Sequence, residues 1–170
     1  MSHSWQLDFV GAIKKSYPEF FTNAKVLEVG SLDINGSIRP FFENCDYLGV
    51  DLGEGCGVDM VAKGEELDFP DGAFDTTASC ECFEHNEKWA KTFQNMVRMT
   101  RPGGLVFFTC ATTGRPEHGT RRTTPQDAPF CGDYYRNLVA EDFQDLLADF
   151  AEHHFSTYIH DLRFAGIKNG

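Results

Sequence analysis

The residues best suited to chemistry gather in one short segment, SCECFEHNEKW at positions 79–89. It holds two thiols, three carboxylates and one imidazole, a mixture that suits either a metal site or an acid/base centre. A structural zinc site usually needs two closely spaced pairs of Cys or His, and the chain has no second pair of neighbouring cysteines. If the segment begins as a strand, Cys80 and Cys82 face one side and Glu81 the other. We therefore expect no metal here.

Glu84 and His85 come directly after this strand, where a titratable pair can face a substrate. A neutral imidazole near pH 7 suits general-base work. We rank His85 first, Glu84 second and His118, from a loop further along the chain, third as candidate catalytic residues. The alternative is that Glu84 and His85 cap the next helix, because a negative charge is favoured at the amino end of a helix.

The elements that position these residues follow from the apolar pattern. Short apolar runs predict strands at 25–31, 46–52, 58–62, 74–82 and 104–112. Apolar residues spaced by three and four predict helices over 4–17, 87–100 and about 140–153, and Pro40 marks the start of another within 36–44. His153 and His154 then lie at a helix end, and residues 154–168 form a tight hairpin. Because strands alternate with helices, we expect an α/β fold with a doubly wound, mostly parallel sheet and a C-terminal antiparallel hairpin.

Length and composition narrow the class of protein. The 170 residues, 41% of them hydrophobic, are enough for one globular domain, 1–170, with a single core. A net charge of −11 would repel a polyphosphate backbone, so we expect a small-molecule partner and no long nucleic acid. The first ten residues lack a basic start followed by an apolar run, and no apolar stretch is long enough to span a bilayer. We expect a cytoplasmic protein with free thiols and no membrane partner.

The segment EVGSLDING, 28–36, leaves the first predicted strand, and Asp51 ends the second. A glycine turn lets a ligand approach the backbone, and an acid about twenty residues later can accept the hydroxyls of a ribose. Dinucleotide-binding domains use the same two devices. The chain, however, lacks the GxGxxG motif of those domains.

Together with FPDGAFD (69–75), FEH (83–85) and RPGG (101–104), these motifs resemble the class I S-adenosylmethionine-dependent methyltransferases, particularly their small type 11 group. The resemblance covers about 25–106 and implies a Rossmann-like fold, S-adenosyl-L-methionine as cofactor, and transfer of a methyl group to a small molecule. A non-catalytic S-adenosylmethionine-binding or interaction module is the alternative. The resemblance implies these cofactor-binding residues: Glu28, Gly30, Ser31, Leu32, Asp33, Asp51, Leu52, Gly64, Glu65, Ser79, Cys80 and Glu81. Leu32 and Ile34 stand where the family often has glycine, and Lys63 where it often has an acid.

The segment 113–137 is longer and more polar than a mere connection requires. Part of it, DYYRNL at 133–138, resembles the DYWRFT segment of methyltransferases associated with sugar or cell-surface polymer pathways. We expect this loop to fold over the cofactor and to bind the acceptor, a sugar or an anionic metabolite, through Arg121, Arg122, Tyr135 and Arg136. The alternative for Arg121 and Arg122 is that they form salt bridges with the many acids.

The third predicted strand, 58–62, is followed by KGEELDFPDG, which leaves no room for a helix to cover it. An uncovered strand at a sheet edge is a template for pairing with another chain. We therefore expect a homodimer that uses this edge or the adjacent face.

Overall fold

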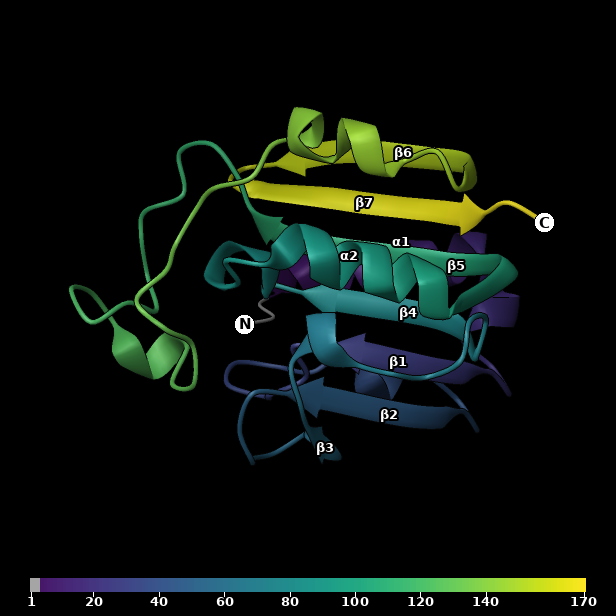
Figure 1. The fold of residues 1–170 in the computed structure, drawn as a ribbon, viewed down its shortest axis with the longest axis horizontal. Helices are drawn as coiled ribbons and strands as arrows, with labels where there is room; N and C mark the ends of the chain where they lie inside the picture. Colours follow the sequence, from purple (N-terminus) through teal and green to yellow (C-terminus); the bar gives the residue numbers. More distant parts are fainter. Residues whose placement is uncertain (1–3) are drawn as a thin grey trace.

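The computed structural model describes residues 4–170, and its seven strands form one sheet in the order β3-β2-β1-β4-β5-β7-β6 (Figure 1). The strands are β1 (Lys25–Val29), β2 (Asp46–Asp51), β3 (Met60–Val61), β4 (Phe74–Cys80), β5 (Thr100–Ala111), β6 (Phe150–Tyr158) and β7 (Asp161–Lys168). The first five pair in parallel, whereas β7 runs antiparallel between β5 and β6. The predicted mostly parallel α/β sheet with a C-terminal hairpin is confirmed.

Two α-helices cover opposite faces of the sheet, α2 (Trp89–Met99) in front and α1 (Ser4–Ser16) behind in the view of Figure 1. Strand β5 contributes to both cores. Val106, Phe108 and Cys110 pack in the cluster that contains α2, and Leu105 and Phe107 in the cluster that contains α1. A strand covered on both sides needs apolar residues at successive positions, which explains the unbroken run in this part of the sequence.

Short 3₁₀-helices make most of the remaining connections. They are η1 (Pro18–Phe20), η2 (Arg39–Phe41), η3 (Gly64–Glu66), η4 (Phe83–His85), η5 (Pro125–Asp127) and η6 (Ala140–Leu146). The helix expected within 36–44 is only the single turn η2. The half of the sheet formed by β1, β2 and β3 is therefore connected mainly by loops, which leaves the carboxyl ends of these strands accessible.

The predicted helix over 140–153 is wrong. Only η6 forms, and β6 begins at Phe150, so His153 and His154 lie exposed on a strand rather than at a helix end. The physical reason is tertiary: β6 pairs along its length with β7, and Phe155 packs against Phe164 with ring centroids 4.8 Å apart. This pairing and packing outweigh the helical spacing of the apolar residues.

The end of β4 also departs from the expectation. Glu81 adopts a left-handed backbone conformation, with φ of 54°, directly after the strand ends at Cys80. The alternation of side chains is broken there, so Cys80 packs in the α1 cluster and Cys82 against the α2 cluster. The expectation that the two thiols share one face is therefore wrong.

All six cysteines are free thiols in the structure. Within residues 4–170, neither helix has the length and apolar character needed to cross a lipid bilayer.

Candidate active site

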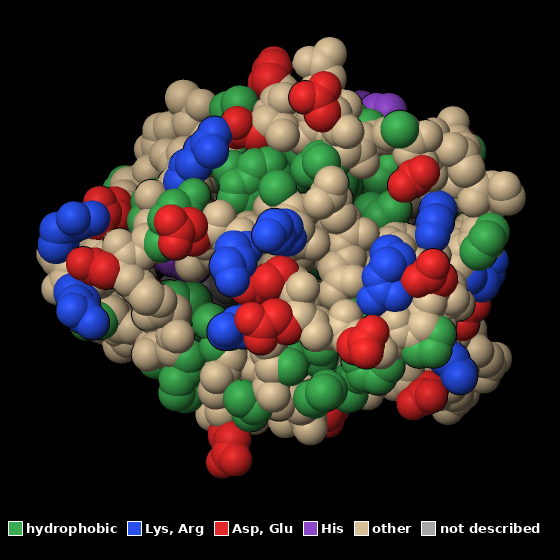
Figure 2. Space-filling view, viewed as in Figure 1, with side chains coloured by type: hydrophobic (Ala, Val, Ile, Leu, Met, Phe, Trp, Pro, Cys, Tyr) green, Lys and Arg blue, Asp and Glu red, His purple; other side chains and the backbone are tan. Residues whose placement is uncertain are grey.

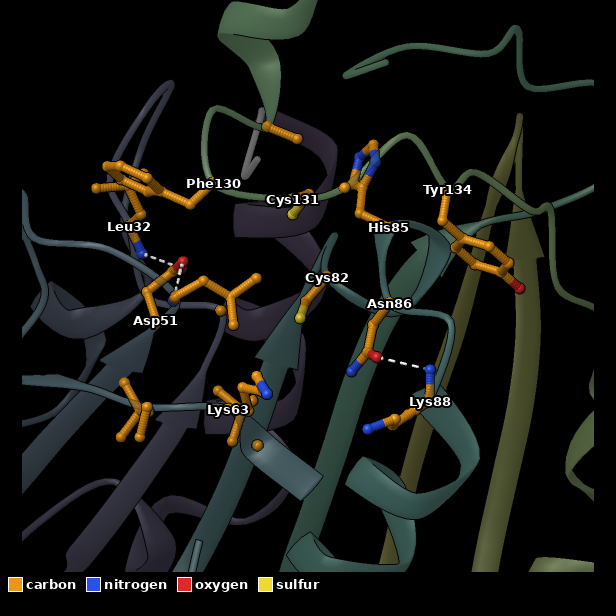
Figure 3. A pocket seen from close by; sticks show the side chains of 18 of the residues that line it. Leu32, Asp51, Lys63, Cys82, His85, Asn86, Lys88, Phe130, Cys131 and Tyr134 are labelled. Carbon is orange, nitrogen blue, oxygen red and sulfur yellow. Dashed lines mark hydrogen bonds between the residues drawn. The ribbon is translucent and has the colours of Figure 1, made fainter. Parts of the chain in front are cut away.

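A cavity of about 720 Å³ opens at the carboxyl ends of the parallel strands (Figure 3). Its walls come from the turns after β1, β2 and β4, from η3, and from the long loop 113–137. Ligands of doubly wound sheets bind at this edge, and the volume is in the range of small-molecule sites. Seven of the twelve predicted cofactor-binding residues line it: Gly30, Leu32, Asp51, Leu52, Gly64, Glu65 and Glu81.

Asp51 anchors the cavity at the end of β2. Its carboxylate accepts hydrogen bonds from the backbone N–H groups of Leu32, at 3.0 Å, and Leu52, at 2.7 Å (Figure 3). A carboxylate offers about four lone-pair positions, so two remain for hydroxyl groups of a ligand. The two backbone bonds hold the carboxylate in place and join the turns after β1 and β2.

Gly30 permits the close approach that this arrangement requires. Its φ is +85°, and a Cβ atom at this position would lie 2.6 Å from the Cβ of Cys82. Any other residue would be strained and would collide with the turn after β4. The first turn is therefore in direct contact with the turn after β4, and Gly30 itself lines the cavity.

The cavity wall carries more negative than positive groups. Its carboxylates are Asp51, Glu65, Glu66, Glu81, Glu87 and Asp127, and its ammonium groups are Lys63 and Lys88. Burial raises the pKa of Glu81 well above its ordinary value, and the nearby Glu84 raises it further. Even with Glu81 neutral, five acids face two lysines. Such a wall favours a cationic ligand and opposes the diphosphate of a dinucleotide.

The other predicted cofactor residues lie outside the cavity wall. Glu28 is buried and accepts a hydrogen bond of 2.7 Å from the Tyr47 hydroxyl, and burial raises the pKa of Glu28 to about 7. Ser79 Oγ donates to the Val29 carbonyl at 2.8 Å, and Asp33 accepts from the Gly36 N–H at 2.8 Å. Ser31 and Cys80 are buried. None of these five residues lines the cavity.

The three predicted catalytic residues come together. One ligand-type atom from each of Glu84, His85 and His118 lies within 4.8 Å of the others. Glu84 is fully buried, and neither carboxylate oxygen has a hydrogen-bond partner among the described residues. Burial lowers the pKa of His85, against a smaller opposing effect of Glu84, so this imidazole is neutral at pH 7. His85 also lines the cavity.

The loop 113–137 contributes to the cavity wall through residues other than the predicted ones. Residues 127–132 and Tyr134 form part of the wall. The Phe130 ring lies so close to Gly53 that a Cβ there would approach within 2.4 Å. Phe130 was missed by the sequence analysis, and its only signal was an aromatic side chain in a polar segment. Tyr134 belongs to the DYYRNL segment, although it was not among the residues predicted to bind the acceptor.

None of the predicted substrate-binding residues lines the cavity. Arg122 pairs with Glu117 at 2.8 Å and Arg136 with Asp142 at 2.5 Å, whereas Arg121 is exposed. Tyr135 packs its ring 5.5 Å from that of His85 and 5.0 Å from that of His118. It therefore contacts the catalytic candidates rather than the cavity.

Two short segments fasten the loop to the sheet, and we call residues 115–116 and 135–138 the loop stem. The N–H groups of Arg136 and Leu138 donate to the carbonyls of Glu84 and Ala111, each at 2.9 Å. Across the stem, Tyr135 donates to the Pro116 carbonyl at 3.2 Å and Asn137 to the Arg115 carbonyl at 3.0 Å. Residues 117–134, the loop head, lie beyond these bonds.

Residues 27–108 match the family model Methyltransf_11, described as a methyltransferase domain. Over this stretch, slightly less than half of the chain, the sequence is similar to the type 11 methyltransferase domain family. The matched region contains Asp51, Glu84 and His85, and it agrees with the extent of the resemblance seen in the sequence. The search among curated proteins found no match.

Solved structures with this fold include several methyltransferases. The chain is 18% identical to Burkholderia thailandensis 1,6-didemethyltoxoflavin-N1-methyltransferase, solved with bound 1,6-didemethyltoxoflavin and S-adenosylhomocysteine. The TM-score is 0.67 over 96% of this chain and 78% of that one. Haemonchus contortus phosphoethanolamine N-methyltransferase 2, in complex with S-adenosyl-L-methionine, is 17% identical with a TM-score of 0.69, and 96% of this chain covers 53% of it. The chain thus spans about half the length of the nematode protein.

The same fold also occurs in a protein with a different activity. The [4+2]-cyclase SpnF is 11% identical, with a TM-score of 0.68 over 96% of this chain and 80% of that one. The TM-scores show that this chain shares its fold with these methyltransferases and with the cyclase. The fold alone does not specify the reaction, which has to follow from the site itself.

Proposed function

We propose that this protein binds S-adenosyl-L-methionine and transfers its methyl group to a small-molecule acceptor. The observation that carries the proposal is the acidic cavity at the carboxyl ends of β1, β2 and β4, with Asp51 held at the end of β2. S-adenosylmethionine carries a sulfonium cation, which a negatively charged wall attracts, and a ribose whose hydroxyls suit the free lone pairs of Asp51.

The proposed cofactor position follows from the wall. Asp51 holds the ribose, and the side chains of Leu32 and Leu52 flank it. The backbone at Gly30 faces the methionine part, and Gly64 with Glu65 faces the adenine. Five predicted cofactor-binding residues do not touch the ligand in this proposal but stabilise the strands and turns around it. They are Glu28, Ser31, Asp33, Ser79 and Cys80.

Methyl transfer is an in-line displacement, in which an oxygen, nitrogen or carbon atom of the acceptor approaches the methyl group opposite the sulfur. Alignment and exclusion of water supply most of the rate for such a reaction. The loop head provides the cover, because Phe130 and Tyr134 close one side of the cavity. We place the acceptor beside His85, where the cluster with Glu84 and His118 can receive a proton.

The acceptor is best described as a neutral or cationic molecule with a hydroxyl or amine, a sugar being one such class. An anionic acceptor was suggested by the arginines of the loop, but Arg122 and Arg136 are paired with Glu117 and Asp142. The acidic cavity wall would also repel an anion. Both features therefore favour an uncharged or positively charged acceptor.

A long nucleic acid remains an unsuitable partner in this proposal. The chain carries a net charge of −11, and Figure 2 shows Lys and Arg side chains interspersed with Asp and Glu on this face, without a continuous basic patch. Phosphate backbones are bound by clustered positive charge. We also propose that the protein acts in the cytoplasm and as a homodimer through the β3 edge, where Met60 and Val61 are exposed.

The second candidate is a module that binds S-adenosylmethionine without methyl transfer. The [4+2]-cyclase supports this alternative, because it shows that the fold is not confined to methyltransferases. Two measurements separate the candidates. Calorimetry with S-adenosylhomocysteine tests binding, and incubation with labelled S-adenosylmethionine and a metabolite extract tests turnover. We expect micromolar binding and a labelled product. Binding without label identifies the module, and failure of S-adenosylhomocysteine to bind overturns both candidates.

A further inference from the structure

We propose that Glu84, His85 and His118 form a binding site for a divalent first-row transition metal ion at the acceptor end of the cavity. Glu84 and His85 are adjacent in η4, and His118 comes from the loop head, more than thirty residues later in the chain. The fold brings one oxygen and two nitrogen atoms of these side chains within 4.8 Å of one another. The existence of this site does not depend on methyl transfer; only its role as an acceptor site rests on the proposed function.

The carboxylate of Glu84 is the strongest indication of a missing partner. It is fully buried, and its two oxygens receive no hydrogen bond from the described residues. Arg136 approaches only the backbone of Glu84, through its N–H, and its guanidinium pairs with Asp142. A buried carboxylate without a hydrogen bond or a counter-charge is strongly unfavourable, and a bound cation removes this cost.

His118 is arranged as metal-binding histidines usually are. Nδ1 of His118 lies 3.1 Å from the Pro116 carbonyl, which can only accept a hydrogen bond, so Nδ1 carries the proton. Nε2 of His118 then presents its lone pair, and this atom is buried without a partner. A backbone carbonyl that fixes the tautomer in this way is a common companion of metal ligands. Both ring nitrogens of His85 also lack a hydrogen-bond partner.

The donor set and spacing fit a small transition metal. Two imidazoles and one carboxylate are the protein ligands of several catalytic zinc and iron(II) sites. Bonds of about 2.1 Å in a tetrahedral site would separate the ligand atoms by about 3.4 Å, so the cluster needs to contract by at most about 1.4 Å. His118 lies on the loop head and can make this adjustment without a change in the sheet.

The position of the cluster leaves one side of the ion open. His85 lines the cavity, so an ion bound by the three residues would face the space proposed for the acceptor. Three protein ligands with an open position are typical of catalytic rather than structural metal sites. An oxygen or nitrogen of the acceptor would complete the coordination, which would orient the acceptor and make its proton easier to lose to water. In the metal-loaded site this would replace the receipt of the proton by the cluster itself.

Metal titration of the purified full chain tests the proposal. The protein is stripped with a chelator, dialysed, and titrated with Zn²⁺ by calorimetry, with the bound ion counted by atomic emission. We expect one equivalent per chain. Co²⁺ is titrated in parallel, and we expect its visible ligand-field bands without a sulfur-to-cobalt charge-transfer band, because none of the three ligands is a thiolate.

Two variants and one control make the test specific. His118→Ala should weaken Zn²⁺ binding about tenfold or more, and Glu84→Gln should do the same. His154→Ala removes an exposed imidazole from β6 and should bind Zn²⁺ as the wild type does. Thermal unfolding identifies any variant that fails to fold, and His118→Ala alone suffices if Glu84→Gln does. Less than stoichiometric binding, a thiolate band with Co²⁺, or unchanged affinity of His118→Ala overturns the site. S-adenosylhomocysteine binding is measured separately, so loss of one proposal is distinguishable from loss of the other.

Discussion

Replacement of Glu28 by Gln should remove a large part of the pH dependence of stability. The carboxyl of Glu28 is buried beneath the cavity, and burial raises its pKa from 4.5 to about 7 in the folded chain. Between these two values the folded state holds a proton that the unfolded state has released. The free energy of unfolding therefore falls as pH rises through this window, by about 1.4 kcal/mol per pH unit.

The expected magnitude follows directly. From 4.5 to about 7 the decline sums to about 3 kcal/mol, a substantial share of the 5–15 kcal/mol that stabilises a typical domain. Gln has no proton to release and can still accept the hydrogen bond from Tyr47. Glu28→Gln should thus gain about 3 kcal/mol relative to wild type above pH 7, and little of that difference should remain at pH 4.5.

Urea unfolding of both proteins at half-unit intervals from pH 4.5 to 8 measures this difference. Tyr47→Phe is an informative second variant, because the Tyr47 hydroxyl lowers the pKa of Glu28 and its loss should move the decline to higher pH. Glu54→Gln, at an exposed position, is the matched control and should retain the wild-type slope. Parallel curves for wild type and Glu28→Gln across the whole range would refute the reasoning.

Three further predictions concern the site and the assembly. Asp51→Ala should weaken S-adenosylhomocysteine binding by about ten- to a hundredfold in calorimetry, since about 1.5–3 kcal/mol of charge-assisted hydrogen bonding is lost. Asp46→Ala, at the exposed start of β2, is the control and should leave the affinity unchanged. Tyr135→Phe should reduce methyl transfer while S-adenosylhomocysteine affinity stays within about threefold, because alignment of the acceptor and binding of the cofactor are separate contributions. Arg121→Ala is its exposed control, and equal rates for the two variants would exclude a role for Tyr135. Light scattering of the wild-type protein should give the mass of a dimer. Val61→Lys, on the exposed β3 edge, should yield monomers. A monomeric wild type at high protein concentration would contradict the dimer.

The sequence was sufficient to predict the sheet because short apolar runs mark its strands and distinguish them from the connecting segments. The uninterrupted apolar run of β5 requires cover on both faces, and two helices provide it. The predicted helix over 140–153 failed because Phe143, Leu146, Leu147 and Phe150 have the i, i+3, i+4, i+7 spacing of a helix, although in the structure they pack in the core from η6 and the start of β6. Pairing of β6 with β7, which decides between helix and strand, is not visible locally.

The site was predictable where it depends on strand ends and not where it depends on the loop. Asp51 and Gly30 follow strands, so their place at the cavity follows from the parallel sheet. The path of residues 113–137 is fixed by long-range bonds such as that from Arg136 N–H to the Glu84 carbonyl, which no spacing reveals. The same path brings His118 to Glu84 and His85, whereas a metal search in the sequence considers neighbouring pairs of Cys or His.

The loop stem also bears on when the acceptor end of the proposed site is assembled. Because the stem is bonded to Glu84 and Ala111 on one side and across itself on the other, an opening of this loop would begin at the loop head. The head carries both Phe130, which lines the cavity, and His118, which completes the cluster with Glu84 and His85. Under the proposed function, one movement of the head would therefore admit the cofactor and separate His118 from the other two residues, and the reverse movement would enclose the cofactor and restore the cluster. Ligand exchange and methyl transfer would then be different steps of one cycle.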